Sequence, residues 1–361
     1  MSTHFHELTV KRITPETSEG AAITLEVPAA LRELFSFRPG QFLTLRATIN
    51  GVAQRRSYSI CSSTLRYERD GELEVGIKRV ENGVFSTWAT TQLKPGDTLA
   101  VMPPDGRFTP KQPGAMHRAG FAAGSGITPM LSIITSTLEG DAGSSFTLVY
   151  GNQRVNSIMF SEQLQDLKDR FASRFNLIHV LSRQPQEVAL FNGRLDTPKV
   201  AALLAAALPA SSIDEAFICG PAGMIDGTER ALMDAGLPRE RIHAERFLAD
   251  GATAPAPAAP RRPEDARTAD FHLDVVVDGK THHFGMAATD RVLDIALEGG
   301  LDLPYSCKGG VCCTCRAKVM EGRVQMDRNY TLEQWEVDKG FVLTCQARPL
   351  TQKVVVSYDE R

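Results

Sequence analysis

Four cysteines in the carboxy-terminal part of the chain have a spacing that strongly restricts its fold. They follow the pattern C-x4-C-x2-C with a fourth cysteine thirty positions later, as Cys307, Cys312, Cys315 and Cys345. This is the ligand spacing of a plant-type [2Fe–2S] cluster, in which four thiolates bind two irons. Residues 308–310 (Lys-Gly-Gly) let the backbone curl around inorganic sulfides, because glycine tolerates positive φ and close approach. The sequence therefore predicts a [2Fe–2S] cluster bound by these four cysteines.

Other uses of cysteine fit this pattern less well. Seven cysteines occur in the chain, and five of them lie in the last 55 residues. A set of disulfides is typical of secreted proteins, and the first residues show no basic region followed by an apolar run, so we expect no signal peptide. A structural zinc site usually shows two separated C-x2-C pairs. Cys313 falls outside the spacing, and we interpret it as a small filler residue, with a substitute ligand as the alternative.

Composition and charge limit the possible partners. The net charge is −3, with 42% hydrophobic and 23% charged residues, which is typical of a soluble protein and gives no indication of nucleic-acid binding. The longest apolar run with helical character, Val200 to Leu208, is too short to span a bilayer. We therefore expect a cytoplasmic protein that binds neither nucleic acid nor membrane.

Shifts in composition divide the chain into segments. Residues 1–112 contain six short strand-like stretches separated by turn signals, which predicts a small antiparallel β-barrel. Residues 113–250 alternate strands and helices, which predicts a parallel sheet with helices on both faces. Residues 251–268 are rich in proline and alanine and are predicted to form a semi-rigid linker. Residues 269–361 combine the cysteine motif with a hairpin and a helix capped by Thr289, which predicts an α+β domain.

Two motifs in the barrel segment carry groups suited to a nucleotide cofactor. In Arg56-Ser57-Tyr58-Ser59, the arginine can pair with a phosphate, the tyrosine can stack on a flat heterocycle and the serine can reach a ring nitrogen. In Asn82 to Thr87 a glycine turn leads into a helix start, where we expect Ser86 or Thr87 as N-cap, and the N–H groups of such a start bind phosphate. Each motif alone also fits a surface arginine, a core tyrosine or a simple helix cap.

The α/β segment has further motifs at the ends of its predicted strands. The run Gly124-Ser125-Gly126-Ile127-Thr128-Pro129 allows a tight turn toward a phosphate, with its threonine as a cap and its proline at the first helical position. Ser182-Arg183 follows another strand and can hold a ribose 2′-phosphate, although a solvated loop explains this pair equally well. Cys219-Gly220-Pro221 lies at the carboxyl edge of the sheet, where ligands bind. Glu245 and Phe247 close the segment.

Taken in order, these motifs resemble those of the ferredoxin–NADP reductase superfamily. With a plant-type ferredoxin domain at the carboxy terminus, the chain is similar to the reductase components of multicomponent oxygenases. The resemblance covers nearly the whole chain except the linker. It is carried by four phrases: residues 55–61, 122–130, 216–221 and 303–312. It implies a multidomain fold with a flavin-binding antiparallel barrel, an α/β nucleotide-binding domain and an α+β ferredoxin domain of β-grasp type.

The resemblance also implies roles for individual residues. Those expected near the reacting rings are Ser59, Cys219 and Glu245. Those expected to bind FAD are Arg56, Ser57, Tyr58, Ser59, Lys78, Val84, Phe85, Ser86, Thr87 and Phe247. Those expected to bind the nicotinamide cofactor are Gly124, Gly126, Thr128, Ser182, Arg183, Cys219 and Gly220. The implied cofactors are FAD, a [2Fe–2S] cluster and NADPH in preference to NADH. The implied partners are the oxygenase subunits of a monooxygenase, with a diiron centre favoured.

The pairing of carriers indicates an electron-transfer enzyme. A nicotinamide gives up two electrons together, an iron–sulfur cluster accepts one, and a flavin can do both. We therefore expect no general base or catalytic triad, because the cofactors carry the chemistry. Two alternatives remain open. One is the reductase of a different oxygenase, such as a ring-hydroxylating dioxygenase or a diiron hydroxylase. The other is a redox-sensing protein, against which the full set of hydride-accepting residues argues.

Overall fold

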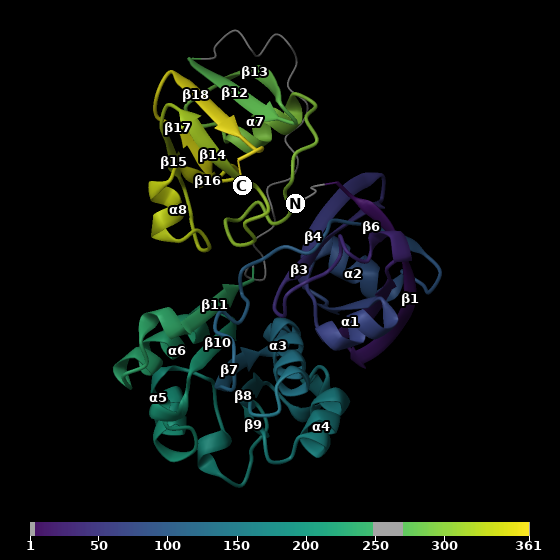
Figure 1. Ribbon diagram of the computed structural model, residues 1–361, viewed down its shortest axis with the longest axis vertical. Coiled ribbons are helices and arrows are strands. Elements are labelled where there is room, and N and C mark those ends of the chain that lie inside the picture. The colour runs from purple at the N-terminus through teal and green to yellow at the C-terminus, as the bar shows by residue number, and fades with distance from the viewer. Residues whose placement is uncertain (1–3, 248–269, 361) are drawn as a thin grey trace. The chain divides into compact units, whose positions relative to one another are not determined.

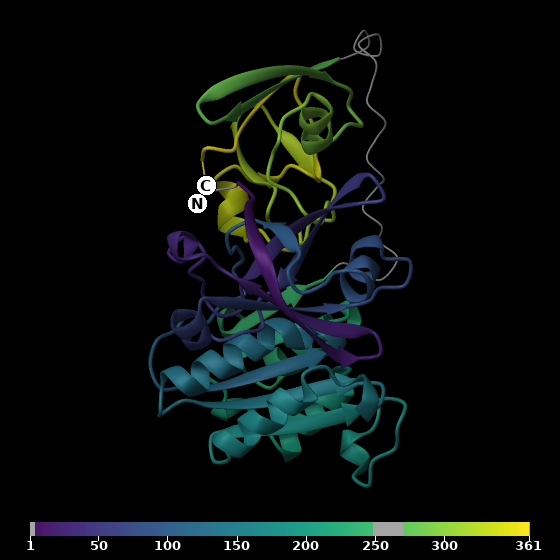
Figure 2. The ribbon, with the colours of Figure 1, turned by 90° about the vertical axis from the view of Figure 1, so that its right-hand side faces the viewer.

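The computed structural model describes residues 4–247 and 270–360, and the predicted linker 251–268 lies outside them. The chain divides into two compact units, an amino-terminal unit (Met1–Ala249) and a carboxy-terminal unit (Asp250–Arg361). Figures 1 and 2 show the elements of each. Within the described ranges, no helix has the length and apolar character needed to cross a membrane.

The first part of the amino-terminal unit is a closed antiparallel barrel. Its strands are β1 (His6–Thr17), β2 (Gly20–Glu26), β3 (Phe42–Ile49), β4 (Val52–Ser59), β5 (Glu72–Lys78) and β6 (Thr98–Val101). They pair in the order β4-β3-β6-β1-β2-β5. The two end strands meet through a bridge between Ile60 and Val75, and the Cys61 N–H donates to the Glu74 carbonyl over 2.8 Å. The alternating strand pattern therefore predicted the barrel correctly.

Two helices accompany the barrel, and one was not predicted. Helix α1 (Thr64–Asp70) begins after Ser63, whose hydroxyl accepts the Arg66 N–H, and ends at Gly71 in the left-handed conformation. Helix α2 (Val84–Thr91) buries Phe85 and Ala89 in the barrel core. The expected N-cap at Ser86 or Thr87 is wrong. The N-cap is Gly83, and the Ser86 hydroxyl instead accepts the Val80 N–H over 3.1 Å.

The second part of the amino-terminal unit is a parallel five-stranded sheet. Its strands are β7 (His117–Ala123), β8 (Ser145–Asn152), β9 (Phe175–Leu181), β10 (Glu215–Gly220) and β11 (Ile242–Arg246). They are arranged in the order β11-β10-β7-β8-β9, so the chain order reverses between β7 and β10. In open parallel sheets, ligands bind outside the carboxyl ends of the strands at such a switch point. The sheet therefore predicts a binding crevice where Ala123 and Gly220 end their strands.

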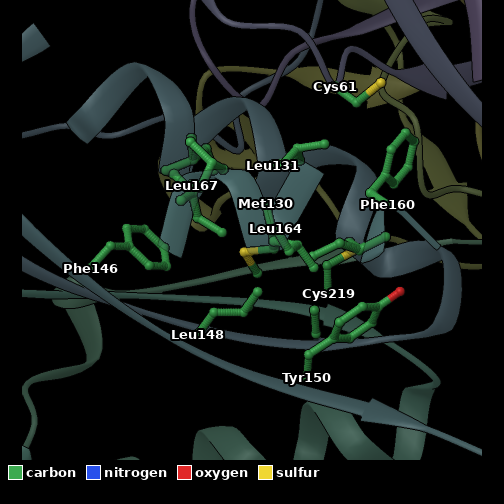
Figure 3. Packing of buried hydrophobic residues seen from close by; sticks show 14 of the residues in the cluster. Cys61, Met130, Leu131, Phe146, Leu148, Tyr150, Phe160, Leu164, Leu167 and Cys219 are labelled. Carbon is green, nitrogen blue, oxygen red and sulfur yellow. The ribbon is translucent and has the colours of Figure 1, made fainter. Parts of the chain in front are cut away.

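Helices cover both faces of this sheet. They are α3 (Ile127–Gly140), α4 (Ser161–Arg170), α5 (Thr197–Ala206) and α6 (Ala222–Asp234). One core joins α3 and α4 to strand residues such as Phe146, Leu148 and Tyr150, and Figure 3 shows it from close by. The other joins α5 and α6 to alternate residues such as Phe121 and Val149. Because successive strand side chains point to opposite faces, each strand supplies both cores.

A buried ionic cluster ties the segment after the barrel to the base of the sheet. Glu215 is 1% exposed, and its carboxylate accepts from Arg118 Nε over 3.0 Å and the Lys111 N–H over 2.9 Å. His243 Nε2 lies 3.1 Å from the same carboxylate. Burial opposes ionisation, but these hydrogen bonds hold the pKa of Glu215 below its usual value. These ionic contacts therefore fix the path of the chain from the barrel into β7.

The carboxy-terminal unit is a mixed sheet accompanied by two short helices. Its five strands are β13 (Lys280–Met286), β12 (Phe271–Val277), β18 (Lys353–Ser357), β14 (Arg316–Glu321) and β16 (Phe341–Leu343), in that order. A small two-stranded sheet joins β15 (Val324–Met326) to β17 (Ala347–Pro349), and the helices are α7 (Val292–Glu298) and α8 (Gln334–Asp338). Strands β12 and β18 are parallel, and the remaining pairs are antiparallel. This is the predicted α+β architecture.

The local predictions in this unit are partly correct. The hairpin of β12 and β13 turns at Asp278 and Gly279, both with positive φ, as the Asp-Gly pair predicts. The prediction that Thr289 caps the following helix is wrong, because α7 begins at Val292 with Arg291 as N-cap. Val292 and Ile295 bury one face of this helix in the core of the unit.

Candidate functional site

The predicted flavin-binding strand lies at an end of the barrel order and is partly exposed. Arg56, Ser57 and Tyr58 are half-buried on β4, and Ser59 is buried. The Arg56 guanidinium donates to the Arg55 carbonyl over 2.7 Å, which holds the side chain along the strand. The Tyr58 ring lies 5.7 Å from the Phe85 ring. Alternation along β4 places Arg56 and Tyr58 on one face of the strand and the Ser57 and Ser59 hydroxyls on the other.

The start of helix α2 supplies a second group of expected flavin-binding residues. No side chain caps this helix, so its first N–H groups are available to a phosphate. Val84 is exposed at the helix start, whereas Phe85 and Ser86 are buried and Thr87 is half-buried. Lys78, at the end of β5, lies 4.0 Å from the Glu19 carboxylate. These positions are compatible with phosphate binding.

Three residues from distant parts of the chain meet where the barrel and the sheet adjoin. The Ser59 hydroxyl donates to Glu245 Oε2 over 3.4 Å, although 186 positions separate them. Cys219 on β10 is the register partner of Glu245 on β11. Cys219 is fully buried, and burial, followed by the neighbouring Glu245 carboxyl, raises the pKa of its thiol well above the usual value. The thiol is therefore neutral and suited to positioning rather than nucleophilic attack.

Glu245 carries the carboxyl of this group, and the pKa of that carboxyl is strongly raised. Burial raises its pKa to about 8, against which the hydrogen bond from Ser59 acts in the opposite direction. Its carboxyl is consequently protonated at neutral pH and can share a proton with a neighbouring polar atom. Perturbed carboxyl groups beside a crevice are frequent at functional sites.

Replacing Glu245 by glutamine is expected to stabilise the flavoprotein more at about pH 9 than at about pH 5. The folded carboxyl keeps its proton to about pH 8 whereas the unfolded one loses it near 4.5. The contribution of Glu245 to the free energy of unfolding is thus fully present below the unfolded-state pKa and is lost as pH rises through the folded-state pKa. Partial exposure limits the gain to roughly 1 kcal/mol, or about 2–4 °C in melting temperature.

The change can be followed as the temperature at which flavin fluorescence rises on unfolding. Glu240→Gln makes the same replacement at an exposed position. Its melting temperature relative to wild type should not vary over this pH range. If the melting temperature of Glu245→Gln relative to wild type is also the same at both pH values, the folded protein does not raise the pKa of this carboxyl.

The predicted nucleotide loop lies at the switch point of the sheet. Gly124 has φ of 53°, and its carbonyl accepts the Tyr150 hydroxyl over 2.9 Å. At Gly126 an added Cβ would stand 2.0 Å from the Cys219 carbonyl oxygen. The loop therefore rests directly on the strand end that carries Cys219 and Gly220.

The predicted cap of the helix after this loop is wrong. Helix α3 begins at Ile127 with Gly126 as N-cap, so Thr128 and Pro129 occupy its second and third positions. The Thr128 side chain is buried, and its hydroxyl donates to the Ser125 carbonyl over 3.0 Å. Its backbone still lies in the first turn, where N–H groups have no acceptor within the helix.

The remaining nucleotide residues follow the outer strands. Ser182 and Arg183 come directly after β9, and their N–H groups donate to the carbonyls of Asn152 and Gln153, each over 2.9 Å. Arg183 is exposed. This places a hydroxyl and a guanidinium at the carboxyl edge of the sheet. Phe247 directly follows β11 and is 36% exposed.

The four predicted cluster ligands come together in the carboxy-terminal unit. All four thiols are buried. Cys307 hydrogen bonds with Cys312, and Cys315 with Cys345. The Cys312 hydrogen bond, with backbone N–H groups of Gly309, Val311 and Cys312, lowers the pKa of Cys307 to about 6 despite burial. The hydrogen bond within the second pair likewise lowers the pKa of Cys345, whereas the same two hydrogen bonds, together with burial, raise the pKa of Cys312 and Cys315 well above the usual value. One thiol of each pair is thus favoured as the thiolate that iron ligation requires.

The surroundings of the thiols fit a binuclear cluster. Two pairs of thiols match two irons. The Thr314 side chain, between two ligands, is buried and hydrogen bonds with Cys312. Cys313 is half-buried with φ of 62°.

Some residues of the site could not be found by motif reasoning. Tyr150 and Gln346 contact the predicted loops, yet neither belongs to a motif considered above. Thr314 could have been noticed from its place between Cys312 and Cys315. The contact of Gln346 with a carbonyl 38 positions away has no sequence signal.

Family models match three successive parts of the chain. Residues 7–109 match an oxidoreductase FAD-binding domain, residues 121–230 an oxidoreductase NAD-binding domain, and residues 275–350 a 2Fe-2S iron-sulfur cluster binding domain. The three models follow the order of the barrel, the parallel sheet and the cysteine-containing unit.

Two curated proteins are similar over nearly their whole length. One component of the 1,2-phenylacetyl-CoA epoxidase of Escherichia coli is 44% identical, covering 99% of each chain. The 3-ketosteroid-9-alpha-monooxygenase ferredoxin reductase component of Rhodococcus rhodochrous is 36% identical, covering 97% of this chain and 96% of the relative. Within the superfamily, the four sequence phrases described above resemble this epoxidase component in particular.

A solved structure shows the same fold at low sequence identity. Phthalate dioxygenase reductase, described as a modular structure for electron transfer from pyridine nucleotides to [2Fe–2S], is 22% identical with a TM-score of 0.61, covering 98% of each chain. Together with the thiol pairs and the meeting of Ser59, Cys219 and Glu245, these findings confirm the expected architecture. The chain belongs to the ferredoxin–NADP reductase-type reductase components of oxygenases, oxidoreductases that pass electrons from a pyridine nucleotide through FAD to a [2Fe–2S] cluster.

Proposed function

We propose that this chain is the reductase of a phenylacetyl-CoA 1,2-epoxidase complex and serves phenylacetate degradation. The observation that carries an electron-transfer function is the meeting of Ser59, Cys219 and Glu245 between barrel and sheet, on a chain that also carries four paired thiols. The 44% identity over 99% of both chains supports the choice of oxygenase. When bound, the flavin accepts a hydride and releases electrons singly to the cluster.

The residues that would hold each cofactor are proposed from their placement. The barrel side, with Arg56, Ser57, Tyr58, Lys78 and the start of α2, would bind FAD. The loop Gly124 to Thr128 would bind the pyrophosphate of the nicotinamide cofactor, with Cys219 and Gly220 beside its ring and Phe247 near the flavin. Cys307, Cys312, Cys315 and Cys345 would bind the cluster. The proposed domain boundaries are 1–112, 113–250 and 269–361, joined by the linker 251–268.

The choice of NADPH rests on the loop after β9. Ser182 and the exposed Arg183 lie at the carboxyl edge of the sheet. The Arg183 guanidinium suits a dianionic 2′-phosphate, because arginine binds phosphate through paired charge-assisted hydrogen bonds. A 2′-hydroxyl would need an acceptor in place of Arg183. We therefore propose NADPH as the electron donor.

The partner is proposed to be a cytoplasmic oxygenase with a diiron centre. The similar 3-ketosteroid-9-alpha-monooxygenase reductase, 36% identical, makes the reductase of another oxygenase the second candidate. Both candidates share the electron path up to the cluster. They differ only in the protein that receives the electrons.

The deciding experiment counts product against donor. The holoprotein is reduced anaerobically with NADPH and mixed with the oxygenase subunits and phenylacetyl-CoA. Oxygen is then admitted and epoxide per NADPH is measured, with NADH in a parallel reaction. We expect close to one epoxide per NADPH and slower reduction by NADH. Reduction of flavin and cluster without epoxide would exclude this partner, and equal rates with both donors would exclude the assignment to Arg183.

A further inference from the structure

The buried amide of Gln346 joins the fourth proposed ligand to the loop that holds the other three. Gln346 is 2% exposed. Its Nε2 lies 2.9 Å from the Lys308 carbonyl oxygen and 2.8 Å from the Cys345 carbonyl oxygen. A primary amide carries two N–H donors, which these two carbonyls share with a third acceptor. That third acceptor is the Cys345 sulfur, to which Nε2 donates over 3.6 Å.

The backbone of Gln346 is fixed, so its side chain is aimed by the fold. Its N–H donates to the Leu343 carbonyl over 2.8 Å, and its carbonyl accepts the Asp327 N–H over 3.0 Å. The added Cβ of a residue at 310 would come within 3.3 Å of Gln346 Cγ, so the side chain is packed against the ligand loop. Little freedom remains for the amide to find other acceptors.

The anchored Lys308 carbonyl controls the direction of an amide that faces a ligand. Lys308 has φ of 49°, a conformation that is uncommon outside glycine. In a planar trans peptide the C=O and the following N–H point in opposite directions. Gln346 holds the C=O outward, and the Gly309 N–H of the same peptide donates to the Cys307 sulfur over 3.3 Å.

A second anchor shows that this geometry is systematic. The Gly310 carbonyl accepts the Tyr330 N–H over 3.1 Å. The Val311 N–H, in the same peptide as that carbonyl, hydrogen bonds to Cys307. Anchored carbonyls thus alternate with amides aimed at sulfur. The Tyr330 anchor is backbone, whereas the Gln346 anchor is a side chain that mutation can remove.

We propose that Gln346 is a positioning residue that raises the reduction potential of the [2Fe–2S] cluster. It does so by holding the Lys308–Gly309 peptide with its N–H toward Cys307. One-electron reduction adds negative charge to the cluster, and N–H donors to its sulfurs favour the reduced state. Without the anchor the peptide can rotate, and the reduced state loses one donor. The inference rests on the proposed four-cysteine cluster, and not on the identity of the oxygenase.

The Gln346→Met variant tests this, because methionine has similar length and no donor. We expect its one-electron equilibrium constant for reduction to fall about three- to tenfold, and a tenfold change corresponds to a potential about 59 mV lower. The Fe–S(Cys) stretching bands of the wild type should shift on H/D exchange, and this shift should shrink in the variant. Gln334→Met, on exposed α8 in the same unit, is the matched control and should keep both values.

The outcomes separate this inference from the proposed function. A wild-type protein without a [2Fe–2S] spectrum would contradict the cluster itself. An unchanged potential and isotope shift in Gln346→Met would show that Gln346 only packs. If that variant fails to retain a cluster, Gln346→Leu, which is neutral and has no donors, is measured instead and should have a lower potential. A wild-type spectrum insensitive to H/D exchange would overturn the inference without any variant.

Discussion

The Cys345→Ala variant is expected to keep its flavin and to lose at least about 100-fold in electron transfer to one-electron acceptors. Cys345 is the ligand that arrives from outside the loop, directly after β16 and Thr344, and it pairs with Cys315. Alanine leaves one iron with a single protein thiolate, so the cluster should not be retained. Ser59, Cys219 and Glu245 lie in the other unit, so hydride transfer from NADPH should continue.

Two acceptors distinguish these steps. Ferricyanide reduction reports on the flavin and should remain near wild type, whereas cytochrome c reduction should fall with the loss of the cluster signal in electron paramagnetic resonance. Cys313→Ala is the matched control, since it removes a neighbouring thiol. The backbone at position 313 has φ of 62°, which is as unfavourable for alanine as for cysteine. If Cys313→Ala loses the cluster and Cys345→Ala keeps it, the ligand assignment is wrong and Cys313 is a ligand.

The sequence was most informative where one physical requirement produces a repeated or spaced pattern. Alternation of apolar residues predicted the barrel strands, and the spacing of four cysteines predicted thiols that the structure brings together in pairs. The Asp-Gly hairpin turn was predicted because only a few residues tolerate its positive φ. Such signals depend on neighbours in sequence, so they can be read without the fold.

Predictions failed where tertiary contacts decide the role of a polar side chain. Ser86, Thr128 and Thr289 were each expected to cap a helix, and none does. Ser86 and Thr128 instead bond to the backbone beside a helix that begins at or after glycine. Helix α1 was missed although Ser63 and Gly71 are suitable caps, because its few residues show no clear apolar period.

The contacts that build the site were the hardest to anticipate. The approach of Ser59 to Glu245 spans 186 positions and depends on how the barrel packs on the sheet. Motif order and family resemblance pointed to both residues, but their hydrogen bond required the fold. The Gln346 anchor is similar, because its acceptor lies in a loop that it meets only after β16 and β14 have paired.

Gly126→Ala is expected to lower kcat/KM for NADPH by at least about 100-fold while flavin stays bound, because small misplacements of reacting groups cost about that much. The new Cβ would stand 2.0 Å from the Cys219 carbonyl oxygen and 2.5 Å from its carbonyl carbon. Both are backbone atoms of β10, so no side chain can turn away to relieve the clash. Either the loop or the strand end must move, and each carries groups proposed to position the nicotinamide.

Stopped-flow reduction of the flavin by NADPH measures this directly, and flavin content per protein shows whether the unit still folds. Gly140→Ala, at the other end of the same helix, is the matched control, because its added Cβ meets nothing within 4 Å. It should reduce its flavin at the wild-type rate. A Gly126→Ala protein with normal reduction would mean that the close contact between the loop and β10 is not needed for hydride transfer. Slow flavin reduction by Gly126→Ala at wild-type flavin content would locate the defect at the switch point of the sheet, since the barrel would then be intact.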